Sequence, residues 1–66
     1  MTGKVKWFDD KKGFGFVTPD EGGPDAFVHH TQIRMKGRRT LETGQAVRFT
    51  VEESERGPKA VNVVAA

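Results

Sequence analysis

Two short segments, KGFGFV at residues 12–17 and AFVHH at residues 26–30, decide the fold of this chain. Read as strands, both segments place alternate side chains on one face of a sheet. The side chains that would share a face are one lysine, three phenylalanines, one aspartate and one histidine: Lys12, Phe14, Phe16, Asp25, Phe27 and His29. Pairing of the two strands would gather flat rings and charged groups on one patch of surface.

Turn signals divide the rest of the chain into short strands. Asp10-Lys11-Lys12-Gly13 and Gly22-Gly23-Pro24-Asp25 are typical of turns. The expected strands are 4–9, 14–19, 26–30, 46–53 and 59–64. No sustained helical period is present, so we expect at most one helical turn near residues 31–33, at the start of a long polar connection. Short strands at this spacing predict an all-β chain folded as a small barrel, whose closure leaves no exposed sheet edge.

The first strand conflicts with strict alternation. Alternation would place Val5 and Trp7 on one face, so the single tryptophan would share the face of a core valine. A β-bulge or a strongly curled strand breaks this rule. We therefore expect an irregularity within residues 4–9, at a position that the sequence pattern does not specify.

Size and composition indicate one small domain over residues 1–66, with a thin core. Valines and one phenylalanine supply the expected interior: Val5, Val17, Val28, Val47, Phe49, Val51, Val61 and Val63. The chain has no cysteine, which excludes disulfides and thiolate metal sites. No leader segment is evident and no apolar stretch is long enough to span a bilayer. We therefore expect a cytoplasmic protein with no membrane partner.

The net charge is only +2, but the cations are clustered along the chain. The two clusters are Lys4, Lys6, Lys11 and Lys12, and Arg34, Lys36, Arg38 and Arg39. If the clusters converge in space, they form a patch that faces phosphates. Solvated loop charge is the alternative interpretation for each cluster taken alone.

Phe14 and Phe16 have two interpretations. Phenyl groups usually lie in a core, but Lys12 on the same face resists burial, and the valines already suffice for a narrow interior. Exposed rings beside cations are the platforms on which unstacked nucleic-acid bases bind. The residues by themselves leave both interpretations open.

Other chemistry has little support in the sequence. The spacing Gly13-x-Gly15-x-x-Thr18 lacks the third glycine of a dinucleotide-binding fingerprint, and no helix follows it. His29 and His30, as neighbours in a strand, would point to opposite faces and would not chelate one metal ion. No nucleophile has an evident base, and the acidic pairs lie in loops or at strand ends: Asp9-Asp10, Asp20-Glu21 and Glu52-Glu53. We therefore expect no catalysis, no cofactor and no metal.

The two opening segments resemble the ribonucleoprotein motifs of the cold-shock protein family. The likeness extends to residues 3–8, 41–47 and 56–58, in order and with the family's spacing. It implies a five-stranded antiparallel barrel of the oligonucleotide-binding (OB) type that binds single-stranded RNA and DNA, with a bias toward pyrimidine-rich strands. It also implies a role in melting RNA secondary structure and in adaptation to cold or other stress. We expect the protein to be a monomer.

Carried over by position, the family's site falls on rings, cations and one carboxylate: Lys6, Trp7, Phe8, Lys12, Phe14, Phe16, Asp25, Phe27, His29, His30, Arg38 and Arg56. The resemblance implies base stacking on the rings, with Phe8 beside them, and phosphate or base-edge contacts for Lys6 and Lys12. It implies that Asp25 accepts a hydrogen bond from a base and that Arg56 flanks the groove.

Three residues depart from the family's usual pattern. His30 and Arg38 stand where the family has aromatic residues, and Asp9 stands where it has asparagine. Histidine and arginine also stack on bases, but they are weaker apolar platforms. The resemblance therefore implies lower affinity at these two positions, and weaker binding near the negative charge of Asp9.

Two other classes of binding module compete with this interpretation. An RRM has a similar first motif, but it has an aromatic residue where Pro19 stands, and it needs two helices. A small-barrel interaction module would instead use exposed aromatics to hold a proline-rich peptide. The two basic clusters argue against that second alternative.

Overall fold

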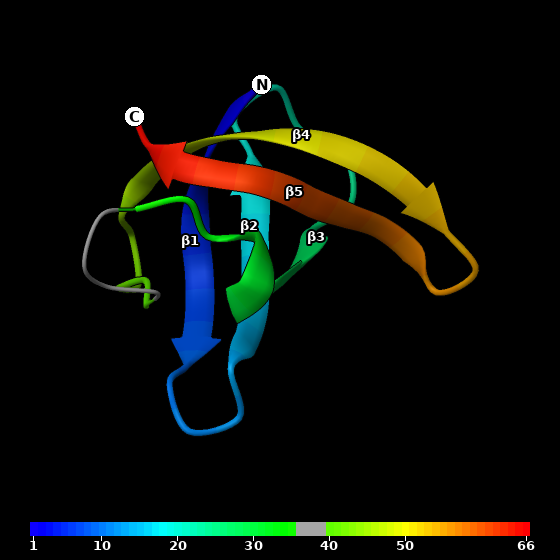
Figure 1. Cartoon of the computed structure of the whole chain (residues 1–66). Coiled ribbons are helices and arrows are strands. Elements are labelled where there is room, and N and C mark those ends of the chain that lie inside the picture. The colour runs from blue at the N-terminus through cyan, green and yellow to red at the C-terminus, as the bar shows by residue number, and fades with distance from the viewer. Residues whose placement is uncertain (36–39) are drawn as a thin grey trace.

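The computed structural model describes residues 1–35 and 40–66, and its strands form a closed barrel (Figure 1). The elements are β1 (Thr2–Asp9), β2 (Phe14–Pro19), β3 (Ala26–His29), the short 3-10 helix η1 (His30–Gln32), β4 (Ala46–Ser54) and β5 (Gly57–Ala65). Around the barrel their order is β1-β2-β3-β5-β4. The predicted all-β barrel of five strands is confirmed, with strand bounds that differ from the expected ones by a few residues.

One strand pair in the barrel is parallel. Strands β1/β2, β2/β3, β4/β5 and β1/β4 are antiparallel, whereas β3 pairs with β5 in parallel, through Phe27 opposite Lys59 and Val28 opposite Ala60. An odd number of strands in a closed ring cannot alternate in direction all the way round. An otherwise antiparallel barrel of five strands must therefore close through one parallel pair.

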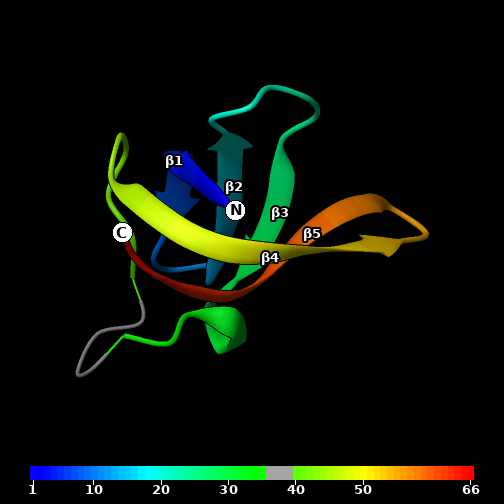
Figure 2. The same cartoon turned by 90° about the horizontal axis from the view of Figure 1, so that it is seen from above.

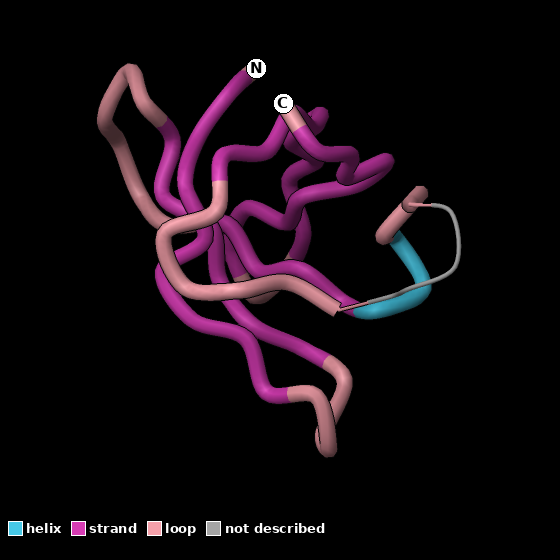
Figure 3. Tube along the Cα trace, turned by 90° about the vertical axis from the view of Figure 1, so that its left-hand side faces the viewer, coloured by secondary structure: helices cyan, strands magenta, loops and turns pink. Residues whose placement is uncertain are grey.

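The core lies inside the barrel and is built mainly of valines. Its buried residues are Val5, Val17, Ala26, Val28, Ile33, Leu41, Val47, Phe49, Ala60, Val61 and Val63. The predicted interior is confirmed except that Val51 is half-buried and packs against the rim of the core. Ile33 was not predicted, and it reaches the core because it forms a parallel bridge with Val63 directly after η1. Figure 3 shows η1 following the end of β3.

The irregularity expected in the first strand is a bulge at Lys6. Val5 lies opposite Val17 and Trp7 lies opposite Phe16, so Lys6 is the additional residue between two consecutive pairs. An additional residue reverses the alternation of the side chains that follow it. Val5 is consequently buried, whereas Lys6 and Trp7 are both exposed.

The β4–β5 hairpin is formed by the two longest strands, of 9 residues each, and extends beyond the rest of the barrel (Figure 1). Figures 1 and 2 show its far end, around residues 55–56, extending beyond the other strands. The hairpin stays paired to its tip, where Ser54 lies opposite Gly57 and the Ser54 hydroxyl donates a hydrogen bond to the Gly57 carbonyl at 2.6 Å. This extension places Arg56 and Pro58 beside the outer face of β2 and β3.

Candidate nucleic-acid interface

Four aromatic rings form a continuous patch on the outer face of β1, β2 and β3. Trp7 lies 5.9 Å from Phe14 and 5.5 Å from Phe16, between ring centroids. Phe27 completes the circuit, at 5.7 Å from Phe14 and 5.8 Å from Phe16. These spacings and the tilted or edge-on ring orientations are those of favourable aromatic pairs. The rings thus support one another without entering the core.

Exposure decides between the two interpretations of the phenylalanines. Trp7 is 39% exposed, and the three phenylalanines of the patch are half-buried. None of the four rings belongs to the core cluster. We call these residues, Trp7, Phe14, Phe16 and Phe27, the aromatic patch.

Phe8 lies apart from the aromatic patch. Because the bulge reverses the alternation of β1, the Phe8 side chain turns inward and packs against the core. It occupies the space that Gly15 leaves open: a Cβ atom added at Gly15 would lie 2.7 Å from Phe8 Cα and 2.9 Å from Phe8 Cδ1. The glycine between Phe14 and Phe16 therefore lets β1 and β2 approach closely while both phenyl rings stay outside.

The two histidines lie side by side, and the prediction that they point to opposite faces is wrong. Their ring centroids are 4.4 Å apart at an interplanar angle of 36°. Strand alternation fails here because β3 ends at His29 and η1 begins at His30. The His30 backbone N–H donates to the Gly13 carbonyl at 2.8 Å, and its ring lies where a Gly13 side chain would be. Gly13 also has a φ of 78°, a conformation that favours glycine.

The His29 ring is held by its neighbour Thr31. The Thr31 backbone N–H donates to His29 Nδ1 at 3.3 Å, and the Thr31 hydroxyl lies 2.9 Å from the same nitrogen. His29 is also the register partner of Phe14, at the edge of the aromatic patch. The two half-buried imidazoles therefore extend the surface that the four rings begin.

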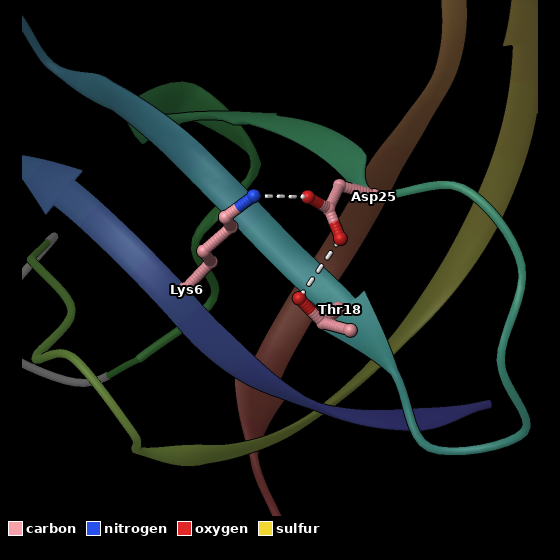
Figure 4. Close-up of polar contacts among 3 residues, drawn as sticks. All are labelled: Lys6, Thr18 and Asp25. Atoms are coloured by element: carbon pink, nitrogen blue, oxygen red, sulfur yellow. Dashed lines mark hydrogen bonds and ion pairs between the residues drawn. The ribbon is translucent and has the colours of Figure 1, made fainter.

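Figure 4 shows a small polar network of Lys6, Thr18 and Asp25, and its Asp25 lines the same hollow as Phe16 and Phe27 of the aromatic patch. Lys6 Nζ donates to Asp25 Oδ2 at 2.9 Å, and Thr18 Oγ1 donates to Asp25 Oδ1 at 2.9 Å. These two hydrogen bonds, with the positive charge of Lys6, lower the pKa of Asp25 below its usual value of 3.8. Lys6 and Asp25 were predicted as site residues, but Thr18 was not. Its position two residues after Phe16, on the same face of β2, is the signal that could have found it.

A hollow of about 640 Å³ separates the aromatic patch from the tip of the β4–β5 hairpin. Its lining combines two rings of the patch, the Asp25 carboxylate and the hairpin tip: Phe16, Asp25, Phe27, Ser54, Glu55, Arg56, Gly57, Pro58 and Lys59. Arg56 thus flanks the same surface as the rings. Pro58 and Lys59 line it as well, although the sequence did not single them out.

Lys12 lies in the exposed turn between β1 and β2, outside either strand. Asp9 shapes this turn, because its Oδ1 accepts hydrogen bonds from the backbone N–H groups of Lys11 at 2.9 Å and Lys12 at 3.0 Å. An asparagine side-chain oxygen can accept the same two bonds. Arg38 lies outside the described residues, so the convergence of the two basic clusters is not visible.

No helix within residues 1–35 and 40–66 is long and apolar enough to cross a membrane. Nor do these ranges contain a group of three or more histidine, aspartate or glutamate side chains placed to hold a metal ion.

Comparisons with known proteins agree with this geometry. The model of the 'Cold-shock' DNA-binding domain matches residues 1–66. Cold shock protein CspV of Vibrio cholerae is 57% identical over 65 residues, which cover 98% of this chain and 93% of the relative. A cold shock-like protein of Thermotoga maritima is 57% identical over 63 residues, covering 96% and 94% of the two chains. Cold shock-like protein CspG of Escherichia coli is 56% identical over 64 residues, covering 97% and 91%.

A solved structure shows the same architecture. Drosophila Unr CSD456 superposes with a TM-score of 0.80 at 25% identity, over 98% of this chain and 26% of that longer chain. Together with the match to the family model, these similarities show that the chain belongs to the cold-shock domain family of nucleic-acid-binding proteins.

Proposed function

We propose that this protein binds single-stranded RNA and DNA by stacking unpaired bases on the aromatic patch. The observation that carries the proposal is the circuit of four partly exposed rings, with centroid spacings of 5.5 to 5.9 Å, on the surface of a cold-shock domain. Stacking of a base on an aromatic side chain contributes about 1–3 kcal/mol. Stacking of several bases on adjacent rings therefore suffices to hold a single strand, with no base pairing.

The surroundings of the patch favour an extended polyanion. Lys12 is exposed on the β1–β2 turn and Arg56 is exposed on the β4–β5 turn, at two sides of the rings. The imidazoles of His29 and His30 continue the flat surface beyond Phe14. Small pyrimidine bases leave room for neighbouring nucleotides on closely spaced rings, so pyrimidine-rich strands are the preferred ligands.

Binding of this kind makes the protein an RNA chaperone without catalysis. A ligand that binds only the unpaired strand shifts a hairpin toward its melted form by mass action. No nucleotide hydrolysis is needed, and the protein acts as a cytoplasmic monomer in cold or other stress. An RNA hairpin that carries a fluorophore and a quencher at its ends should open as protein is added without ATP; a hairpin that stays closed at saturating protein contradicts this role.

A proline-rich peptide is the alternative ligand for exposed aromatics on a small barrel. Parallel titrations with a labelled short oligothymidine and a labelled proline-rich peptide separate the two functions. We expect saturable binding of the oligonucleotide only. Saturation by the peptide, with none by the oligonucleotide, would contradict the proposal.

A further inference from the structure

We propose that Thr18 is a specificity-determining positioning residue, which with Lys6 fixes the Asp25 carboxylate as an acceptor for the N–H edge of a stacked base. The inference rests on the proposed function and deepens it. It assigns a role to a residue that is neither a stacking nor a charged group. It also gives Lys6 a main role other than contact with phosphate, which is to hold the Asp25 carboxylate in place.

The network brings together three separate parts of the chain. Lys6 is the bulge residue of β1, Thr18 lies near the end of β2, and Asp25 immediately precedes β3. Without the bulge, Trp7 would point inward and would not share the outer face with Lys6. Each oxygen of Asp25 has one donor at 2.9 Å, so both the position and the rotation of the carboxylate are fixed.

The fixed carboxylate keeps free capacity to accept hydrogen bonds. An ionised carboxylate has about four lone-pair sites, and Lys6 and Thr18 use two of them. The Asp25 side chain is 30% exposed and lines the hollow together with Phe16 and Phe27. A base stacked on Phe16 or Phe27 lies parallel to the ring and above it, so its edge faces the walls of the hollow, one of which is the Asp25 carboxylate. Asp25 is ionised at neutral pH, as an ordinary aspartate is, and its two donors lower its pKa further, so the group is purely an acceptor there.

An acceptor at this place distinguishes bases by their edges. Thymine and uracil present an N3–H donor at the centre of the Watson–Crick edge, between two carbonyl acceptors. Cytosine presents an N3 acceptor there, which repels a carboxylate aimed at the centre of the edge, and its donor, the N4 amino group, lies to one side. The network therefore favours thymine or uracil over cytosine. Stacking is similar for these pyrimidines, because every base has a π-face. The preference for thymine over cytosine therefore reports the hydrogen bond to Asp25 separately from stacking on the rings.

Lys6 acts mainly through Asp25 in this arrangement. Its ammonium is already paired at 2.9 Å with the carboxylate. A free cation that meets a phosphate would add about 0.7 to the slope of log affinity against log salt for a single strand. We expect Lys6→Met to lower the thymidine preference while changing this slope by much less than that amount.

The test compares Thr18→Val, which keeps the shape of the side chain but removes the donor, with Thr18→Ser, which keeps the donor. The measurement is the dissociation constant for a short oligothymidine and for an oligocytidine of equal length. A net hydrogen bond corresponds to a roughly two- to tenfold change in an equilibrium constant. Thr18→Val should lower the thymidine preference by that factor and leave oligocytidine binding unchanged, and Thr18→Ser should restore the preference.

Two further variants keep the result decisive. Asp25→Asn, which replaces one acceptor oxygen by a donor of the same size, should abolish the preference by itself. In that background, Thr18→Val should have no additional effect. An unchanged preference in Thr18→Val, or an equal loss of affinity for both oligonucleotides in a protein with a normal thermal melt, would overturn the role of Thr18. If the wild-type protein binds neither oligonucleotide, the proposed function itself fails.

Discussion

Trp7 and Phe16 face each other across β1 and β2 with ring centroids 5.5 Å apart, although Val5, two residues before Trp7, is buried in the core. The bulge at Lys6 makes both facts compatible, because it turns the second half of β1 over. A barrel with a thin core thereby keeps its largest side chain on the surface. Exposed aromatics remove apolar area from a core that has little to spare, so we infer that the arrangement serves a ligand.

Replacing one phenylalanine of the aromatic patch by alanine should weaken binding far more than folding. Phe14→Ala, Phe16→Ala and Phe27→Ala should each cost about 1–3 kcal/mol of binding free energy, the usual effect of losing one stacking platform. Thermal melts and oligothymidine titrations of the same samples check this.

Phe49 is the matched control for these three variants, because it is the same residue type with only 2% exposure. Phe49→Ala should cost about 3–5 kcal/mol of folding free energy, enough to unfold so small a domain. If Phe16→Ala unfolds like Phe49→Ala, the patch is part of the core and the assigned role is wrong.

Much of this arrangement could be predicted from the sequence. The period of two in residues 14–17 and 46–53 sets which side chains point inward, and the predicted valines other than Val51 are buried in the barrel. The bulge could not be placed, because one additional residue in a strand leaves no mark in the composition. Phe8, which the resemblance places beside the rings, is half-buried and packs against the core.

The histidines and Thr18 show two other limits of the sequence pattern. The rings of His29 and His30 meet because the strand ends between them, and a strand end is hard to place to a single residue. Thr18 has no chemistry that draws notice by itself. Its place two residues after Phe16 puts it on the outer face of β2, but its role follows from its distance to Asp25, which depends on how β2 and β3 pair.

His30→Phe should tighten the binding of a short oligothymidine. The phenyl ring offers a larger apolar surface than imidazole beside His29, and Gly13 leaves space for a flat ring at this position. The check is a pair of oligothymidine titrations, one with wild-type protein and one with the variant, in the same buffer. Weaker binding of the variant would show that His30 does not act as a stacking platform.

The Lys6–Asp25 ion pair should make stability depend on pH in the acidic range. Lys6 and then Thr18 lower the pKa of Asp25 from 3.8, so the unfolded chain takes up this proton more readily than the folded protein. The contribution to the free energy of unfolding is therefore complete above pH 3.8 and is lost as the pH falls below that value toward the lowered pKa.

Urea unfolding of wild type and Lys6→Met over this range measures the effect. The difference in unfolding free energy between the two proteins should shrink as the pH falls through 3.8. In an Asp25→Asn background, Lys6→Met should produce no such pH-dependent difference. A difference that persists there would assign the effect to a group other than Asp25.

The most direct test of the account is the fluorescence of Trp7, the single tryptophan of the chain and a member of the aromatic patch. Emission is recorded while a short oligothymidine is added, and again with duplex DNA of equal length and in the same salt. Stacking needs a free base face, so the single strand should quench Trp7 to saturation and the duplex should barely change it. Equal affinity for the duplex and the single strand would contradict binding by base stacking.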